Sequence, residues 1–174
     1  MGNVARIVTC LILMFAIVAP ARAASLRAGM AAYNREDFNA AATIFRPLAL
    51  AGDARAQSYL GYMYSTGRGV PQDYAEAAYW YIRAANQGET TAQYMLGLLY
   101  DKGAGVQQDY IKAHMWLDLA AAHAPPRNRD YCARLRDAVA TKMTRGQIGV
   151  ARLLALQWAP ARERPGVVVA PLPN

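Results

Sequence analysis

The amino-acid sequence predicts an all-α fold, an α-solenoid of stacked antiparallel helical hairpins with a degenerate C-terminal helical cap. The main evidence is an internal duplication, because the segment 52–85 recurs as 88–121 at a constant offset and without a gap. Each copy contains two stretches in which apolar residues recur at helical spacing. A glycine-containing turn separates them, so each copy is predicted to form two helices that bury their apolar faces against neighbouring copies.

The composition narrows the class of protein further. Of the 174 residues, 55% are apolar and 18% are charged, with 13 Gly, 9 Pro and 2 Cys. These values exclude a disordered tail, a collagen-like fibre and a disulfide scaffold. A polytopic membrane protein is also excluded, because 7–19 is the one long apolar run. The length fits one domain, or two very small ones.

Residues 1–23 are expected to be a signal peptide. Arg6 supplies a positive charge, 7–18 is apolar, and 21–23 is a small-residue cleavage motif, Ala-Arg-Ala. The apolar stretch is shorter than the roughly 20 residues that span a bilayer. We therefore expect a periplasmic or secreted protein, cleaved near Ala23. The alternative is an N-terminal membrane anchor that is not cleaved.

Charge is distributed unevenly along the chain, whose formal net charge is +7. Removal of 1–23 leaves a net charge of +5, to which 24–125 contributes −1 and 126–174 contributes +6. The basic character therefore belongs to the C-terminal third. Cleavage also leaves Cys132 as the one cysteine, so an intramolecular disulfide is excluded.

The helical repeat domain is expected to span 24–159 and to begin with an incomplete unit. Stepping back by one offset from the first full copy aligns a half-repeat, about 31–51, with the second half of that copy. Helices over 26–33 and 38–50 are expected to form one hairpin. This hairpin would shield the apolar face of the first full repeat, as a terminal repeat must.

Two full repeats follow, at about 52–87 and 88–123. In the first repeat, the apolar stripes of the two helices consist of Ala56, Leu60, Met63 and Tyr64, then of Ala77, Trp80, Tyr81 and Ala84. Gly61 lies within the first helix, where glycine costs about 1 kcal/mol relative to alanine. We therefore expect close helix approach at Gly61 and at its counterpart Gly97, with the ring of Trp80 or Trp116 as the neighbour.

The turn between the helices of each repeat has a distinct composition. In the first repeat it contains Gly67 and Gly69, which can adopt the positive φ that ends a helix, and Pro71, which prevents its continuation. Asp73, followed by Glu76, then predicts a capping box at the start of the second helix.

The residues shared by the two copies fit the motif A-x-x-x-L-G-x-x-Y-x-x-G-x-G-V-x-x-D-x-x-x-A-x-x-W-x-x-x-A-A, which 56–85 and 92–121 both satisfy. This pattern resembles the Sel1-like repeat family, a relative of the tetratricopeptide repeats. The resemblance implies an α-solenoid used as an adaptor surface for other proteins, frequently in bacterial envelopes. A cysteine-rich subgroup is linked with β-lactam or peptidoglycan chemistry, but its cysteine pairs are absent here, so that association does not transfer.

A C-terminal cap, 127–159, is expected to close the stack with a hairpin that departs from the repeat motif. Its first helix, 130–143, would bury a face made of Tyr131, Leu135, Ala138 and Val139. Thr144 and Gln147 predict a capping box at the start of its second helix, whose apolar face consists of Ile148, Ala151, Leu154, Ala155 and Trp158. The Pro-rich tail, 160–174, is expected to be extended or mobile.

Residues capable of chemistry are few. His114 and His123 lie on opposite sides of one predicted helix and cannot share a metal ion, and no other metal motif is present. The evenly spaced Asp37, Asp73 and Asp109 are expected to be helix N-caps and not catalytic acids. We therefore predict no catalytic residue, no cofactor and no metal site, and hence a protein that is not an enzyme.

Cys132 is the one candidate nucleophile. Arg129, Arg134 and Arg136 lie nearby in the sequence and would lower the pKa of its thiol, favouring the thiolate. The thiol could then react or link two chains through a disulfide. The alternative is that Cys132 is a small packing residue within a helix.

A protein-binding surface is expected on the concave face of the solenoid, by analogy with tetratricopeptide hairpins. On the first helix of each repeat, the positions between the packed residues should face this concave surface. The residues at these positions differ between the two copies, whereas the packed residues agree. These candidate partner-binding residues are Arg55, Ser58, Tyr62, Ser65, Thr91, Tyr94, Leu98 and Asp101. The alternative for both tyrosines is packing between helices.

The C-terminal hairpin carries a second candidate surface, a basic patch. It consists of Arg127, Arg129, Arg134, Arg136, Lys142, Arg145 and Arg152. An exported protein meets little nucleic acid, so anionic polysaccharide, a lipid surface or an acidic protein face would suit this patch better. The alternative is a solvated helix surface.

The function predicted from the sequence is that of an exported, non-enzymatic adaptor that binds one or more envelope proteins through its concave face. Two alternatives stay open. One is a subunit of an enzyme that acts on the cell wall. The other is a polysaccharide or membrane-surface binder that uses the basic patch.

Overall fold

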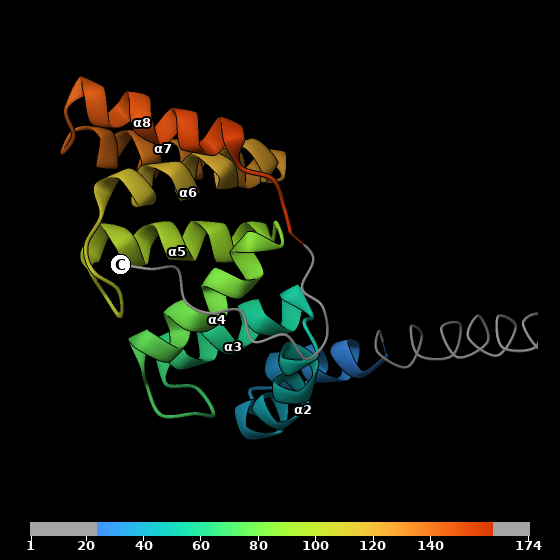
Figure 1. The fold of residues 1–174 in the computed structure, drawn as a ribbon. Coiled ribbons are helices and arrows are strands. Elements are labelled where there is room, and N and C mark those ends of the chain that lie inside the picture. The colour runs from blue at the N-terminus through green and yellow to red at the C-terminus, as the bar shows by residue number, and fades with distance from the viewer. Residues whose placement is uncertain (1–23, 162–174) are drawn as a thin grey trace, which may run out of the picture.

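The computed structural model describes residues 24–161, which form helices joined by short turns (Figure 1). The helices cover residues 24–34, α2 (Phe38–Leu50), α3 (Ala54–Thr66), α4 (Tyr74–Asn86), α5 (Thr90–Lys102), α6 (Tyr110–His123), α7 (Pro126–Ala140) and α8 (Arg145–Gln157). The expected signal peptide and all but the start of the Pro-rich tail lie outside the described residues. Within 24–161, no helix has the length and apolarity needed to cross a membrane.

The repeat helices pair as antiparallel hairpins, α3 with α4 and α5 with α6, that stack side by side between α2 at one end and the cap at the other (Figure 1). The expected cap hairpin is not formed as such, because α7 and α8 both pack against α6 and barely contact each other. The predicted all-α solenoid with a C-terminal helical cap is therefore confirmed. Both repeat tryptophans are internal, with Trp80 3% and Trp116 2% exposed. Trp80 packs with Phe45 and Leu60, whereas Trp116 packs with Leu96.

Short acidic caps fix the beginnings of the repeat helices. The carboxylates of Asp37, Asp73 and Asp109 accept backbone N–H groups in the first turns of α2, α4 and α6, as predicted. Asp53 and Glu89 do the same for α3 and α5. At α8 both hydrogen bonds of the predicted capping box are present: Gln147 N–H donates to Thr144 Oγ1, and Thr144 N–H donates to Gln147 Oε1.

Glycines end the first helix of each repeat and let the following turn approach the preceding hairpin. Gly67 (φ 71°) and Gly103 (φ 68°) are the left-handed C-caps of α3 and α5, as the sequence predicts for such turns. Gly69 and Gly105 also have positive φ, and their Cα atoms lie against the backbone of Phe38 and of Tyr74. Each turn therefore rests on the start of the second helix of the preceding hairpin.

The neighbours of the mid-helix glycines differ from the prediction. A Cβ at Gly61 would lie 2.8 Å from the ring of Tyr81, and a Cβ at Gly97 would lie 2.7 Å from Leu117. The close approach is real, but the tryptophan one residue earlier points about 100° further round the helix. Trp80 consequently packs toward the preceding hairpin and does not cover Gly61.

The first helix of the cap, α7, differs from the prediction in where it begins and in part of its buried face. Helix α7 begins at Pro126, because proline is favoured in the first turn of a helix, and not at 130. Val139 is buried and Leu135 packs against the core as expected, whereas Tyr131 is 49% exposed, Ala138 is also exposed, and Cys132 is buried instead. In α8, Ala151 is buried as expected, and Trp158 packs edge-on against Trp116, their ring centroids 6.2 Å apart. Leu154, which was expected on the same buried face, is 39% exposed.

Candidate functional site: a pocket on the inner face

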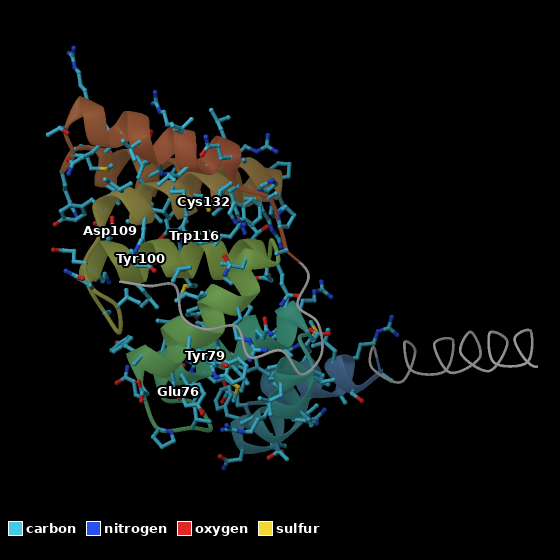
Figure 2. The ribbon with its side chains drawn as sticks, viewed as in Figure 1. Glu76, Tyr79, Tyr100, Asp109, Trp116 and Cys132 are labelled. Atoms are coloured by element: carbon cyan, nitrogen blue, oxygen red, sulfur yellow. The ribbon has the colours of Figure 1, made fainter. Side chains whose placement is uncertain are left out.

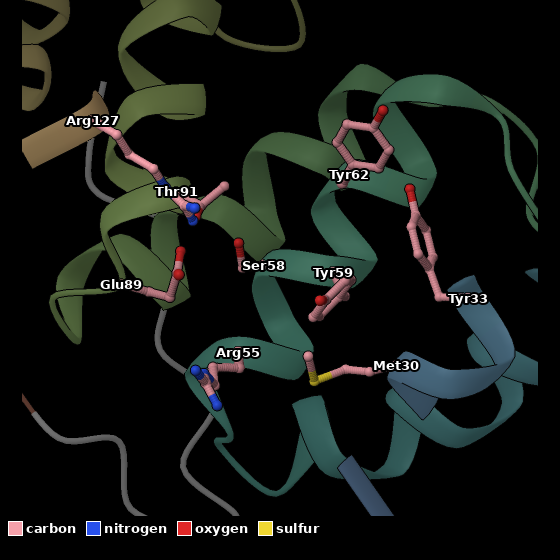
Figure 3. Close-up of a pocket in the computed structure, with 9 residues that line it drawn as sticks. All are labelled: Met30, Tyr33, Arg55, Ser58, Tyr59, Tyr62, Glu89, Thr91 and Arg127. Atoms are coloured by element: carbon pink, nitrogen blue, oxygen red, sulfur yellow. The ribbon is translucent and has the colours of Figure 1, made fainter. Parts of the chain in front are cut away.

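A pocket of about 480 Å³ opens between the first helix (24–34), α3, the start of α5 and the start of α7 (Figure 3). It therefore joins the terminal hairpin, both repeats and the cap. The residues that line it are Met30, Tyr33, Arg55, Ser58, Tyr59, Tyr62, Glu89, Thr91 and Arg127. In Figure 3 the aromatic residues lie toward one end and Glu89, Thr91 and Arg127 toward the other.

The apolar end is built from tyrosines that pack on one another. The ring centroid of Tyr33 lies 5.5 Å from that of Tyr59 and 6.2 Å from that of Tyr62. On its other side Tyr59 stacks on the buried ring of Phe45, at 4.6 Å between centroids and 9° between planes. Burial raises the pKa of the Tyr33 phenol, so this hydroxyl stays protonated at neutral pH. Mutual packing thus holds the aromatic wall rigid.

The polar end is built from the N-termini of three helices. Arg55, Thr91 and Arg127 are each the second residue of their helix, α3, α5 and α7, and they follow one another at the repeat offset. Glu89 caps α5, because its Oε2 accepts the backbone N–H of Ala92 at 2.6 Å. In the part of the chain that the structure describes, no carboxylate pairs with Arg55 or Arg127.

Half of the predicted partner-binding residues line this pocket: Arg55, Ser58, Tyr62 and Thr91. Ser58 is buried at its floor, while Arg55 and Thr91 are exposed. They lie on the first helices of the two full repeats, α3 and α5.

The structure places the other half elsewhere. Ser65 is buried and donates to the carbonyl oxygen of Tyr62, and Leu98 is half-buried outside the pocket. Tyr94 lies 5.9 Å from the ring of Tyr131, and Asp101 holds Lys142 at 2.7 Å. The cap therefore packs against Tyr94 and Asp101 of the second repeat, which contributes only its start, Glu89 and Thr91, to the pocket.

Sequence reasoning missed four lining residues: Met30, Tyr33, Tyr59 and Glu89. Comparison of the copies gives no signal for Tyr33, because its counterpart one offset later is Gly69, which lies in a turn and not in a helix. Glu89 occupies the same cap position as Asp53, a correspondence that the sequence does contain.

The basic patch is divided by ion pairs. Arg136 Nη1 lies 2.8 Å from Asp118 Oδ1, and its Nη2 lies 2.8 Å from Asp137 Oδ1. The hydrogen bonds from Lys142 to Asp101 raise the pKa of this lysine. Arg127 belongs to the pocket. The exposed arginines that remain on the cap are Arg129, Arg134, Arg145 and Arg152.

The groups considered for chemistry are placed away from the pocket. Burial raises the pKa of the Cys132 thiol, which corrects the expected lowering by neighbouring arginines: the side chain points into the packing between α6 and α7 (Figure 2). His114 is buried, and burial lowers its pKa. Among residues 24–161, no three His, Cys, Asp or Glu side chains gather closely enough to hold a metal ion.

Known proteins with similar sequences and structures share this helical repeat architecture. The Sel1 repeat matches residues 54–89 and 90–124. The crystal structure of a Sel1 repeat protein from Oxalobacter formigenes is 34% identical, with a TM-score of 0.58, and the alignment covers 74% of this chain and 98% of that one. This chain belongs to the Sel1 repeat family. Sel1 repeat proteins commonly serve as scaffolds for protein interactions.

A second Sel1-like structure is larger. The crystal structure of c5321, a protective antigen of uropathogenic Escherichia coli strains with this fold, is 32% identical, with a TM-score of 0.72. The alignment covers 79% of this Sel1 repeat chain but 29% of the antigen. A search of curated proteins found no match.

Proposed function

We propose that this Sel1 repeat protein is an exported, non-enzymatic adaptor that holds a protein of the bacterial envelope in the pocket between the first helix, α3, α5 and α7. The observation that carries the proposal is the position of the pocket, which spans consecutive units of a repeat fold. Stacked helical units create extended binding surfaces of this kind.

The composition of the pocket supports a binding role. Tyrosine, methionine and arginine are the residues enriched at protein interfaces, and all three are present. Neither histidine nor cysteine lines the pocket, and its one carboxylate, on Glu89, is engaged as a helix cap. Export is supported by the signal-peptide pattern of 1–23, and the periplasm or the cell exterior is the proposed location.

Affinity purification from the native envelope tests the proposal. The bait is the full chain, compared with Thr91→Trp, which fills the pocket from an exposed position, and with Tyr62→Ala. Thr141→Trp, on the exposed end of α7, is the matched control. We expect the same envelope proteins with wild type and Thr141→Trp, and their loss with the pocket variants.

Recovery of an unchanged set of partners with Thr91→Trp would contradict the pocket assignment. The N-terminus of the protein from its native cell is the measurement for export, since cleavage near Ala23 removes the first 23 residues. An intact Met1 would contradict cleavage and leave the membrane-anchor alternative.

A further inference from the structure

We propose that the partner segment is an acidic peptide, bound with carboxylates beside Arg55 and Arg127 and with an apolar side chain against Tyr33 and Tyr59. This inference rests on the proposed function, because it names the chemistry of the partner at the same pocket.

The charge of the pocket favours an anion. Arg55 and Arg127 both line it, and neither has a carboxylate partner within residues 24–161. The single acidic side chain in the lining, Glu89, already accepts the N–H of Ala92. Guanidinium groups bind carboxylates through paired, charge-assisted hydrogen bonds. A carboxylate of a bound peptide can therefore supply the partner that Arg55 and Arg127 lack within residues 24–161.

Helix geometry adds positive potential at the same end. The N-termini of α3, α5 and α7 carry the positive ends of the helix dipoles. Asp53 neutralises the first of these and Glu89 the second. Helix α7 begins after Pro125 with no side-chain cap and no acidic residue in its first turn, so no anion of its own neutralises the N-terminus that carries Arg127.

The opposite end fits an apolar side chain better than a sugar ring. Carbohydrates stack on open aromatic faces, but one face of Tyr59 is covered by Phe45, and the ring of Tyr33 meets both Tyr59 and Tyr62. The Met30 thioether lies beside these rings in the lining, and its flexible apolar side chain suits contact with an aliphatic group. The volume of about 480 Å³ lies within the range of about 300–1,000 Å³ typical of ligand pockets.

Selection from a phage library of random dodecapeptides on the immobilised full chain tests this inference, with Thr91→Trp as the parallel target. Peptides enriched on the wild type over Thr91→Trp should be richer than the starting library in Asp and Glu, with an apolar residue nearby. An enriched set that is neutral or basic would overturn the acidic assignment and leave the pocket as a protein-binding site. A failure to enrich any peptide over Thr91→Trp would overturn both.

The most enriched acidic peptide then gives the quantitative test, by fluorescence anisotropy. Arg55→Gln and Arg127→Gln should each weaken its binding by about tenfold, the effect of losing one charge-assisted hydrogen bond. Replacing the acidic residue of the peptide with its amide should have a similar effect. Arg145→Gln, an exposed arginine on α8, is the matched control and should bind as the wild type does.

Circular dichroism of each variant establishes that the fold is retained. Equal binding by Arg55→Gln, Arg127→Gln and wild type would overturn the proposal. Polygalacturonate at matched ionic strength is the competing probe for an anionic polysaccharide. We expect it to leave peptide binding unchanged, and displacement that requires Arg55 and Arg127 would overturn the assignment to a peptide.

Discussion

The side-chain amide of Gln57 donates a hydrogen bond to the carbonyl oxygen of Ala49 at 3.0 Å, so the first helix of one repeat closes the end of the hairpin before it. One offset later, Gln93 makes the same bond to Ala85 at 3.4 Å. Both glutamines are fully buried. The repeat offset therefore preserves a hydrogen bond between units as well as the apolar core.

Replacing Gln57 with leucine should destabilise the protein. The change removes this hydrogen bond and the one that Gln87 Nε2 donates to Gln57 Oε1 at 2.8 Å, at a cost of about 0.5–1.5 kcal/mol for each. The free energy of unfolding in urea measures the effect. Gln107→Leu, on an exposed turn, is the control and should change stability by less than about 0.5 kcal/mol. Equal stability of the two variants would show that these bonds contribute nothing.

Two glycine-to-alanine changes should have opposite signs. Gly105→Ala forces a positive φ on alanine, which costs about 1–3 kcal/mol, and its Cβ would clash with the backbone of Tyr74. Gly149 lies within α8 with no neighbour within 4 Å, so Gly149→Ala should stabilise the protein by about 0.5–1 kcal/mol. Thermal unfolding monitored by circular dichroism compares them, and a shift of the same sign in both would contradict these environments.

Stability should fall as the pH decreases through about 6.5, the ordinary pKa of histidine. Burial lowers the pKa of His114, so the unfolded chain binds a proton that the folded chain excludes, and the loss stops growing below the folded-state pKa. Asp118 and Asp137 oppose this shift, whereas Arg136 and Arg152 reinforce it.

Urea unfolding at pH 7 and at lower pH, repeated with His114→Phe, measures this dependence. The phenylalanine variant should lose less stability on acidification. His123→Gln changes an exposed histidine and should retain the behaviour of the wild type. A His114→Phe profile that matched the wild type would assign the dependence to other groups.

The thiol of Cys132 should be unreactive in the folded protein. It is buried and its pKa is raised, so both access and thiolate are reduced. In a Cys10→Ser background, titration with a chromogenic disulfide reagent should detect this thiol only after denaturant is added. Rapid labelling under native conditions, or a disulfide-linked dimer on a non-reducing gel, would contradict the burial.

Local chemistry explains which parts of the fold could be predicted. The turn at Gly67 and the N-cap at Asp73 depend on residues adjacent in sequence, and both form. The capping box predicted from Asp73 and Glu76 is not completed, because the N–H of Asp73 donates to the carbonyl oxygen of Tyr64. The neighbour of Gly61 depends on how two helices cross, and a rotation of one residue exchanges Trp80 for Tyr81. The prediction that Tyr131 lies on the buried face of α7 was wrong for the same reason. Tyr131 and Cys132 are both apolar enough to be buried, and the sequence does not decide between them.

Only half of the candidate partner-binding residues could be placed from the sequence. For these residues the position within the repeat determines whether the side chain is exposed. Arg55 and Thr91 follow the repeat register into the pocket. Tyr94 and Asp101 follow it too, but the cap packs over them. The cap itself keeps the offset: α7 begins at Pro126, where repeat spacing from α3 and α5 places it. The cap therefore keeps the spacing of the repeats although it lacks their motif residues. A comparison of motif residues alone could not predict this spacing.

Gly69 packs against the backbone of Phe38, and Gly105 packs against the backbone of Tyr74. These contacts all run from a later turn to an earlier helix of the chain. Each turn uses a surface made by residues that come earlier in the chain, and none of these turns waits for a residue that comes later. A ribosome delivers the chain in that same order. Every new hairpin can therefore dock on a hairpin that is already complete, whether the chain emerges from a ribosome or on the far side of a membrane.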